Sequence, residues 1–182
     1  MVNVPNLITL ARILSVPVAV WLVLTGHMLA AFWVFVAAGI SDAMDGFIAK
    51  RFNAVTELGA YLDPLADKAL LVSVYVTLGQ QEYLATWLVI LVVFRDVLIV
   101  AGALLFETLT HSLTMQPLMI SKVNTAAQIV LAALVLGFNG FGIDDRMAVQ
   151  VMVPVVAVTT LASGAAYVIK WSRQWALMED GE

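Results

Sequence analysis

Residues 28–49 read MLAAFWVFVAAGISDAMDGFIA, an apolar stretch that carries two aspartates in its second half. A helix needs about 20 mostly apolar residues to cross the hydrocarbon core of a bilayer, and this stretch has that length. An ionisable side chain inside such a helix costs several kcal/mol, so Asp42 and Asp45 indicate a functional site. The stretch therefore predicts a membrane-spanning helix that contributes acidic groups to that site.

The composition supports a membrane environment for the whole chain. Its 182 residues are 62% hydrophobic and 12% charged, with a mean hydropathy of +0.97. A soluble domain has about half apolar and a quarter charged residues, and a chain this short could not bury so much apolar surface in water. The absence of cysteine excludes disulfides and thiolate metal sites. We therefore expect an integral membrane protein.

Six segments are long and apolar enough to cross a bilayer as helices. They are residues 7–25, 28–49, 59–78, 83–106, 120–137 and 148–170. Turn residues interrupt the apolar pattern at 26–27, from 53 onward, at 79–81 and at 139–145, and the polar segment 107–119 is expected to be a loop. The sequence predicts an all-α integral membrane protein, a six-transmembrane-helix bundle that forms a single domain over residues 1–182.

The distribution of Lys and Arg predicts the orientation of the bundle, because cytoplasmic loops carry an excess of both. With a cytoplasmic N-terminus, seven basic residues lie on or near that side, and only Arg146 lies on the far side, while Arg95 falls within the fourth span. The seven are Arg12, Lys50, Arg51, Lys68, Lys122, Lys170 and Arg173. We expect a multi-pass protein of the cell membrane with both termini in the cytoplasm.

The acidic residues of the second and third spans fall on common helical faces. Positions spaced i, i+3, i+4, i+7 share a face, as do positions spaced i, i+4, i+8. The first set is Asp42, Asp45, Gly46 and Ala49, and the second is Gly59, Asp63 and Asp67. Because a short connection joins these two spans, they are expected to be antiparallel neighbours whose acidic faces meet at the cytoplasmic edge of the bilayer.

Four carboxylates gathered at low dielectric repel one another unless a positive charge neutralises them. Their oxygen atoms suit hard divalent ions such as Mg²⁺, Mn²⁺ or Ca²⁺, and the lack of cysteine argues against zinc. Gly46 and Gly59 leave room for a phosphate or a flat base to approach the backbone. The same carboxylates could instead form a proton or cation pathway, which is the alternative from these residues alone.

The run from Asp42 to Asp67 resembles the signature of the CDP-alcohol phosphatidyltransferases. The matching positions read Asp-x-x-Asp-Gly-x-x-Ala over 42–49 and Gly-x-x-x-Asp-x-x-x-Asp over 59–67. The resemblance continues from Asn6 to the sixth span. One position departs from the family pattern, because Lys50 stands where the family usually carries Arg. Arg51 follows directly, so the identity of one phosphate-facing cation stays open between the two.

The resemblance implies transfer of a phosphatidyl group from a CDP-linked lipid, CDP-diacylglycerol, to an alcohol, with release of CMP. It implies that Asp42, Asp45 and Asp63 bind two divalent ions, which are Mg²⁺ or Mn²⁺. Asp67 lies at the same metal site and acts as the general base on the acceptor hydroxyl. Residues at the nucleotide and donor are implied to be Gly46, Ala49, Lys50, Gly59, Asn6 and Thr9.

A second cluster of basic residues is a candidate for binding the acceptor. Arg95 lies within the fourth span next to Asp96, and Lys122 opens the fifth span. Together with Arg51, they could hold an acceptor phosphate, for which arginine offers two parallel donors. Alternatively, Arg95 forms a structural pair with an acid such as Asp96, and Lys122 is a cytoplasmic anchor.

Within the family, residues 94–97 and 120–128 look most like the CMP-forming cardiolipin synthases, whose acceptor is phosphatidylglycerol. Phosphatidylglycerophosphate synthases, which use glycerol 3-phosphate, share Arg95 and Lys122. They more often carry Glu at position 96 and a second basic residue at position 124. The resemblance also implies a homodimer, a membrane-lipid environment and an active site that faces the cytoplasm. No nucleic acid partner is expected.

Overall fold

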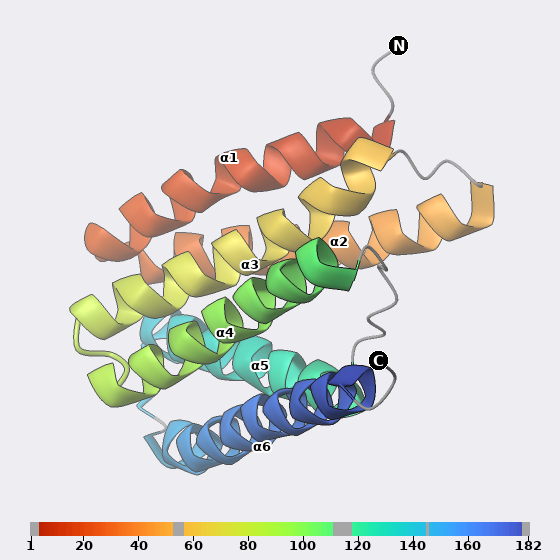
Figure 1. The fold of residues 1–182 in the computed structure, drawn as a ribbon. Coiled ribbons are helices and arrows are strands. Elements are labelled where there is room, and N and C mark those ends of the chain that lie inside the picture. Colours follow the sequence, from red (N-terminus) through yellow and green to blue (C-terminus); the bar gives the residue numbers. More distant parts are fainter. Residues whose placement is uncertain (1–3, 53–56, 111–117, 145, 180–182) are drawn as a thin grey trace. The chain divides into compact units, whose positions relative to one another are not determined.

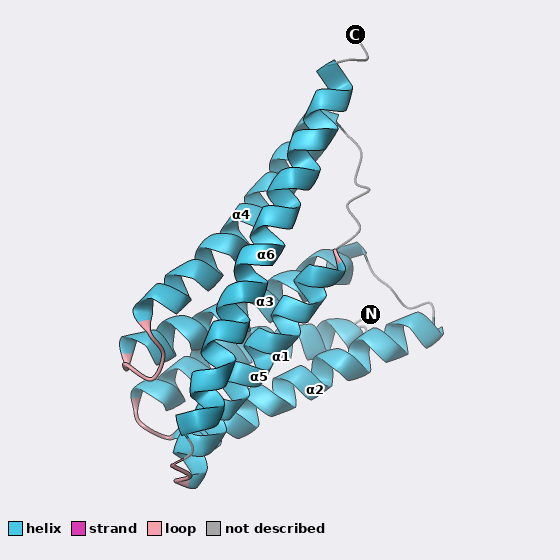
Figure 2. Ribbon diagram, turned by 90° about the horizontal axis from the view of Figure 1, so that it is seen from below, coloured by secondary structure: helices cyan, strands magenta, loops and turns pink. Residues whose placement is uncertain are grey.

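The computed structural model describes residues 4–52, 57–110, 118–144 and 146–179. Within these ranges the chain forms six helices and no other regular element (Figures 1 and 2). They are α1 (Val4–Leu24), α2 (Met28–Phe52), α3 (Glu57–Gln80), α4 (Thr86–Thr110), α5 (Met119–Phe141) and α6 (Arg146–Glu179). The all-α prediction is confirmed, and each helix overlaps one of the predicted spans.

Two stretches within the described residues are long and apolar enough to cross a bilayer, by length and composition. They are Met119–Phe141, with 23 residues, and Met147–Arg173, with 27 residues. Among the residues whose side chains are described, α1 and α2 contribute the shorter apolar stretches Leu10–Leu24 and Met28–Ser41.

The helices fall into two compact units, one of which contains α1, α2, α3 and the last part of α5. In this unit α1 packs against both α2 and α3 (Figure 1). The buried side chains are small or flat where the helices meet, with Ala19 on α1, Ala31 on α2 and Tyr75 on α3 all nearly inaccessible. Small residues let membrane helices approach closely, so α1 holds the two acid-bearing helices together.

Glycines on α5 allow its last turns to lie against α2. A Cβ atom at Gly140 would lie 2.7 Å from the backbone of Leu29, which is closer than real Cβ atoms come. The sequence suggested a break from Asn139 onward, but α5 continues to Phe141. Gly140 therefore serves a close helix contact rather than a turn, which is why its presence misled the prediction.

The ends of α1 and α3 share one hydrogen-bond pattern, at residues 25–27 and 81–85. After α1, Gly26 has a φ of 77°, its N–H bonds to Val23 O, and His27 N–H bonds to Leu22 O. This is the Schellman pattern, which places a left-handed residue directly after the helix. After α3 the same position holds Glu82, with a φ of 61°. That helix therefore passes through the glycine at 79, where the sequence had suggested a break.

The second unit contains α4, the first part of α5 and most of α6. A notch at Gly102 on α4 receives Trp171 of α6, since a Cβ atom there would lie 2.0 Å from the indole ring. Trp171 also packs against Tyr167, whose hydroxyl accepts a hydrogen bond from the backbone N–H of Leu118 at 3.4 Å. The prediction of a loop over 107–119 was wrong for 107–110, which continue α4, and for Met119, which begins α5. Residues 111–117 lie outside the described part.

Candidate functional site

The four aspartates of the signature lie in the two helices predicted for them, with Asp42 and Asp45 in α2 and Asp63 and Asp67 in α3. Continuous helix over these positions supports the spacing argument, because each pair lies within about one turn. The other positions assigned to the donor or to a phosphate also lie in α1, α2 and α3. The side chains of these other residues are outside the described part of the chain. These other residues are Asn6, Thr9, Gly46, Ala49, Lys50, Arg51 and Gly59.

Arg12 lies on the helix that packs against both acid-bearing helices of the first unit. Asp42 and Asp45 are in α2, Asp63 and Asp67 are in α3, and α1 contacts both helices.

Arg12 is buried, with 3% of its surface exposed. It has an interaction partner in the folded chain. A guanidinium is always charged, and burying it without a counter-charge costs several kcal/mol. Arg12 therefore places a fixed positive charge inside the first unit, although the sequence had counted it among the cytoplasmic basic residues.

The carboxylate-only composition of the signature fits hard divalent cations, which prefer oxygen ligands. Among the residues whose side chains are described, no group of three or more His, Cys, Asp or Glu could hold a metal ion. The described part of the chain therefore offers no competing metal site. The side chains of the four aspartates lie outside the described part of the chain, and these residues remain the proposed ligands.

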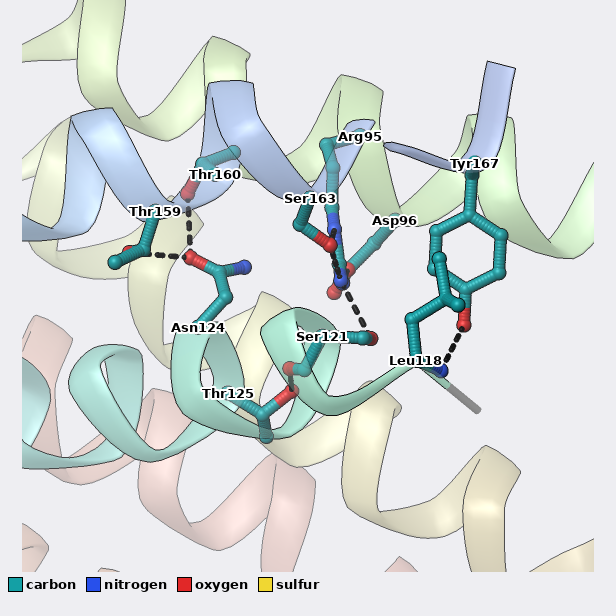
Figure 3. Close-up of polar contacts among 10 residues, drawn as sticks. All are labelled: Arg95, Asp96, Leu118, Ser121, Asn124, Thr125, Thr159, Thr160, Ser163 and Tyr167. Atoms are coloured by element: carbon teal, nitrogen blue, oxygen red, sulfur yellow. Dashed lines mark hydrogen bonds and ion pairs between the residues drawn. The ribbon is translucent and has the colours of Figure 1, made fainter. Parts of the chain in front are cut away.

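Arg95 lies at the centre of a buried polar cluster in the second unit (Figure 3). Its Nη1 donates to Asp96 Oδ1 at 2.6 Å, and Nη2 donates to Ser121 Oγ at 2.6 Å. Nε and Nη2 both donate to Ser163 Oγ, the former at 3.2 Å. Arg95 and Asp96 are only 4% and 6% exposed. The pairing considered from the sequence is thus confirmed, and it joins α4, α5 and α6.

Lys122 differs from Arg95 in its environment. It is exposed on α5, one residue beyond the serine that Arg95 binds. Thr125, on the following turn, is also exposed and donates to the backbone oxygen of Ser121 at 3.1 Å. The structure does not bring Arg95 and Lys122 into one buried cluster, although they lie on neighbouring helices of the same unit.

A group of uncharged polar residues, which the sequence analysis did not single out, joins α5 to α6. Asn124 is fully buried, and its Oδ1 accepts hydrogen bonds from Thr159 Oγ1 at 2.9 Å and Thr160 Oγ1 at 2.8 Å. Ser163, the partner of Arg95, is one helical turn beyond Thr159 and Thr160 on α6. The available signal was the recurrence of Thr and Ser at helical spacing inside an apolar span.

Residues 2–170 match the CDP-alcohol phosphatidyltransferase family. The chain belongs to this family, whose members are integral membrane proteins. Membership confirms the resemblance drawn from the acidic signature.

The curated relatives are named either as CDP-diacylglycerol–glycerol-3-phosphate 3-phosphatidyltransferases or as CMP-forming cardiolipin synthases. The chain is 37% identical to the chloroplastic CDP-diacylglycerol–glycerol-3-phosphate 3-phosphatidyltransferase 1 of Oryza sativa, over 93% of this chain and 57% of the relative. It is 34% identical to the CMP-forming cardiolipin synthase of Rattus norvegicus, over 91% of this chain and 60% of the relative. It is 33% identical to the CDP-diacylglycerol–glycerol-3-phosphate 3-phosphatidyltransferase of Rickettsia typhi, over 92% and 96% of the two chains. The chain thus spans about three fifths of the rice and rat proteins.

Proposed function

We propose that this protein transfers the phosphatidyl group of CDP-diacylglycerol to a glycerol hydroxyl of phosphatidylglycerol, giving cardiolipin and CMP. The family membership and the four aspartates at signature spacing in α2 and α3 support the reaction class. They favour group transfer over the cation or proton carrier that the acids alone would also allow.

Asp42, Asp45 and Asp63 would bind two divalent ions, Mg²⁺ or Mn²⁺. Asp67 would lie at the same metal site. When bound, the ions would neutralise negative charge on the pyrophosphate of the donor. Gly46 and Gly59 leave space beside the nucleotide because they lack side chains. The remaining donor residues are proposed to be Asn6, Thr9, Ala49 and Lys50.

Asp67 is proposed to act as the general base. The acceptor hydroxyl oxygen forms a bond to the phosphorus of the phosphatidyl group, and the bond from that phosphorus to the CMP oxygen breaks. The hydroxyl proton passes to the Asp67 carboxylate, and CMP leaves with the electron pair of the broken bond. A base must come within hydrogen-bond reach of the proton it takes, and Asp67 lies one turn beyond Asp63 on α3.

The proposed acceptor follows from the charges around Arg95. Its guanidinium is already paired with Asp96, so the pair has no net charge to offer a ligand. A phosphodiester such as that of phosphatidylglycerol carries one negative charge, whereas a phosphomonoester carries nearly two at neutral pH. Position 124 adds no charge either, because Asn124 is neutral and buried. The small net charge around Arg95 suits the phosphodiester, and Lys122 in the same unit is a further candidate contact. Arg51 is a separate candidate, carried by the sequence resemblance alone.

Glycerol 3-phosphate is the alternative acceptor, which would make the product phosphatidylglycerophosphate. The observation in its favour is the identity of 37% to the rice relative, whose name specifies that acceptor. Both acceptors offer a glycerol hydroxyl, so the same aspartates would serve either reaction.

We also propose that residues 1–182 form one membrane domain of six spanning helices with both termini in the cytoplasm. The helix order, with an even number of helices, and the excess of Lys and Arg on one side support this topology. The acidic halves of α2 and α3 then lie at the cytoplasmic edge of the cell membrane. A homodimer is the proposed assembly.

The test is an assay of the purified protein in lipid vesicles with labelled CDP-diacylglycerol and Mg²⁺. Phosphatidylglycerol, glycerol 3-phosphate, inositol phosphate and serine are offered in parallel, and each product is identified by mass. Cardiolipin and CMP from the phosphatidylglycerol arm alone would support the proposal. Phosphatidylglycerophosphate as the main product would reassign the acceptor, and a folded protein that releases no CMP with any acceptor would refute the reaction class.

Asp67→Asn tests the base within the same assay. The amide cannot take a proton, so CMP release should fall below about one hundredth of the wild-type rate. Binding of CDP-diacylglycerol should stay measurable by calorimetry. Asp42→Asn is the contrasting variant, because loss of a proposed metal ligand should weaken Mn²⁺ binding as well as turnover.

A further inference from the structure

Ser163 accepts two hydrogen bonds from one guanidinium and keeps a hydroxyl hydrogen that neither bond uses. The two donors are Nε and Nη2 of Arg95. A hydroxyl oxygen has two lone pairs and one hydrogen, so only the hydrogen remains. Within the described part of the chain, Ser163 does not donate to the preceding turn, as Ser172 on the same helix does to Ile169 O at 3.0 Å. Since Ser163 is 0% exposed, it is a buried donor that still needs an acceptor.

The side-chain amide of Asn124 has an unused donor too. Its oxygen accepts hydrogen bonds from Thr159 and Thr160, while its nitrogen, Nδ2, is buried and has no hydrogen-bond partner. The residue as a whole is 0% exposed. Leaving a buried donor unpaired is unfavourable, and two donors cannot satisfy each other. Asn124 and Ser163 therefore both require an acceptor that the protein itself does not supply.

The two donors belong to successive contacts between α5 and α6. In one contact Asn124 meets Thr160, and in the next Ser121 and Ser163 share the guanidinium of Arg95. The contacts are three residues apart on each helix, a rise of about 4.5 Å. Figure 3 shows the Asn124 nitrogen on the side away from the threonine, toward Ser163 and Arg95. Two hydrogen bonds of about 2.8 Å to one water oxygen span a similar distance.

The ligand that suits these donors is an acceptor without charge. The guanidinium of Arg95 is already paired with Asp96, so an anion placed here would be buried without a counter-charge, which is strongly unfavourable. A water molecule accepts two hydrogen bonds and is the usual partner of buried polar groups that lack one in the protein. We propose that one ordered water molecule binds between the Asn124 amide and the Ser163 hydroxyl and accepts a hydrogen bond from each.

The site does not depend on which amide atom is nitrogen, an assignment made from hydrogen-bond networks. With the amide reversed, the oxygen would occupy the end without a direct partner. The water would then donate to that oxygen and still accept from Ser163. In both cases it connects the amide of Asn124 to the polar cluster around Arg95. All of these residues lie in the second unit, and the site holds whichever acceptor the enzyme uses.

Solid-state NMR of the full-length protein in lipid vesicles tests the site directly. With asparagine labelled by ¹⁵N, the side-chain amide protons of Asn124 should show a cross-peak to water, although the residue is shielded from bulk solvent. In Ser163→Ala the water loses one of its two partners, so the cross-peak should weaken at least about twofold. A visible Asn124 amide without a water cross-peak in the wild type would overturn the proposal, as would an unchanged cross-peak in Ser163→Ala.

A double-mutant cycle measures the link between the two residues in a second way. Either Asn124→Ala or Ser163→Ala removes the bridge, so the second substitution should cost less once the first is present. We expect the unfolding equilibrium constants to depart from additivity by at least about threefold, measured by chemical unfolding in detergent micelles. Additive effects of the two substitutions would contradict the bridge.

Thr125→Ala is the matched control for the cycle. Thr125 follows Asn124 on α5 but is exposed, and its hydroxyl donates to the backbone oxygen of Ser121 at 3.1 Å. Combined with Ser163→Ala it should be additive within about twofold, and it should leave the water cross-peak of Asn124 unchanged. If a variant fails to fold, the wild-type spectrum still decides, since the presence of the cross-peak supports the site and its absence refutes it.

Discussion

Arg95 forms a salt bridge with the residue that follows it on α4, with 2.6 Å between its Nη1 and Asp96 Oδ1. Adjacent residues on a helix point about 100° apart, so the long arginine side chain has to fold back for the two groups to meet. Ser121 and Ser163 accept three further hydrogen bonds from the guanidinium, which connects the pair to α5 and α6. Arg95 and Asp96 therefore fix each other's side-chain position.

Breaking this pair should destabilise the protein more than replacing it. Asp96→Asn leaves the buried guanidinium without its counter-charge, and we expect a loss of about 3 kcal/mol in the free energy of unfolding. The double variant Arg95→Met, Asp96→Leu should lose less, since neither charge remains. Chemical unfolding in detergent micelles measures both. A double variant that is less stable than Asp96→Asn would contradict this account.

The notch at Gly102 makes a second prediction about stability. A methyl group there would overlap the Trp171 ring, so Gly102→Ala should cost about 1–3 kcal/mol, as overpacked sites usually do. Gly39→Ala is the control, because no atom lies within 4 Å of a Cβ at that position in α2. It should be neutral or stabilising by up to about 1 kcal/mol, the helix propensity difference. Similar losses in both variants would show that Trp171 moves aside freely.

Arg12 should matter for the acids rather than for the membrane surface. Arg12→Met keeps most of the volume but removes the buried charge from α1, the helix that packs against both α2 and α3. The four carboxylates then repel one another more strongly, so we expect a lower melting temperature without metal and a larger stabilisation by Mn²⁺. Thermal unfolding at increasing Mn²⁺ concentrations measures both, with Arg173→Met as the exposed control. An Arg12→Met protein with the wild-type response would exclude this role.

The left-handed residue after α3 predicts a stabilising substitution. Glu82 has a φ of 61°, in a conformation that costs a side-chain-bearing residue about 1 kcal/mol. Glu82→Gly should therefore raise the free energy of unfolding by a few tenths of a kcal/mol to about 1 kcal/mol. The converse change, Gly26→Ala, should lower it by about 1 kcal/mol, because Gly26 occupies the equivalent position after α1. Opposite signs in chemical unfolding are the result expected.

The six helices and the acidic signature could be predicted from the sequence because both depend on local patterns. Apolar length predicts a span, and the i, i+3 and i, i+4 spacings of the aspartates follow directly from helical geometry. Helix ends were less predictable. Gly79 and Gly140 look like turn residues, yet both lie inside helices, and the left-handed position after α3 is taken by Glu82. Close packing and turns both favour glycine, so composition alone does not separate them.

The contacts of the second unit could not be predicted for a different reason. Asn124 meets Thr159 and Thr160 across 35 residues or more of chain, and this pairing depends on the rotation of α5 and α6 about their axes. Arg95 and Asp96 were predictable as a pair because they are neighbours in sequence. Their two serine partners were not, since Ser121 and Ser163 come from other helices.

The two turns of Schellman type, after α1 and α3, also bear on how the chain enters a membrane. Each is closed by its own backbone hydrogen bonds, and the two connections are only three and five residues long. In the proposed topology these segments must pass through the apolar layer during insertion. A turn whose amide and carbonyl groups are already bonded to each other exposes few polar atoms on the way.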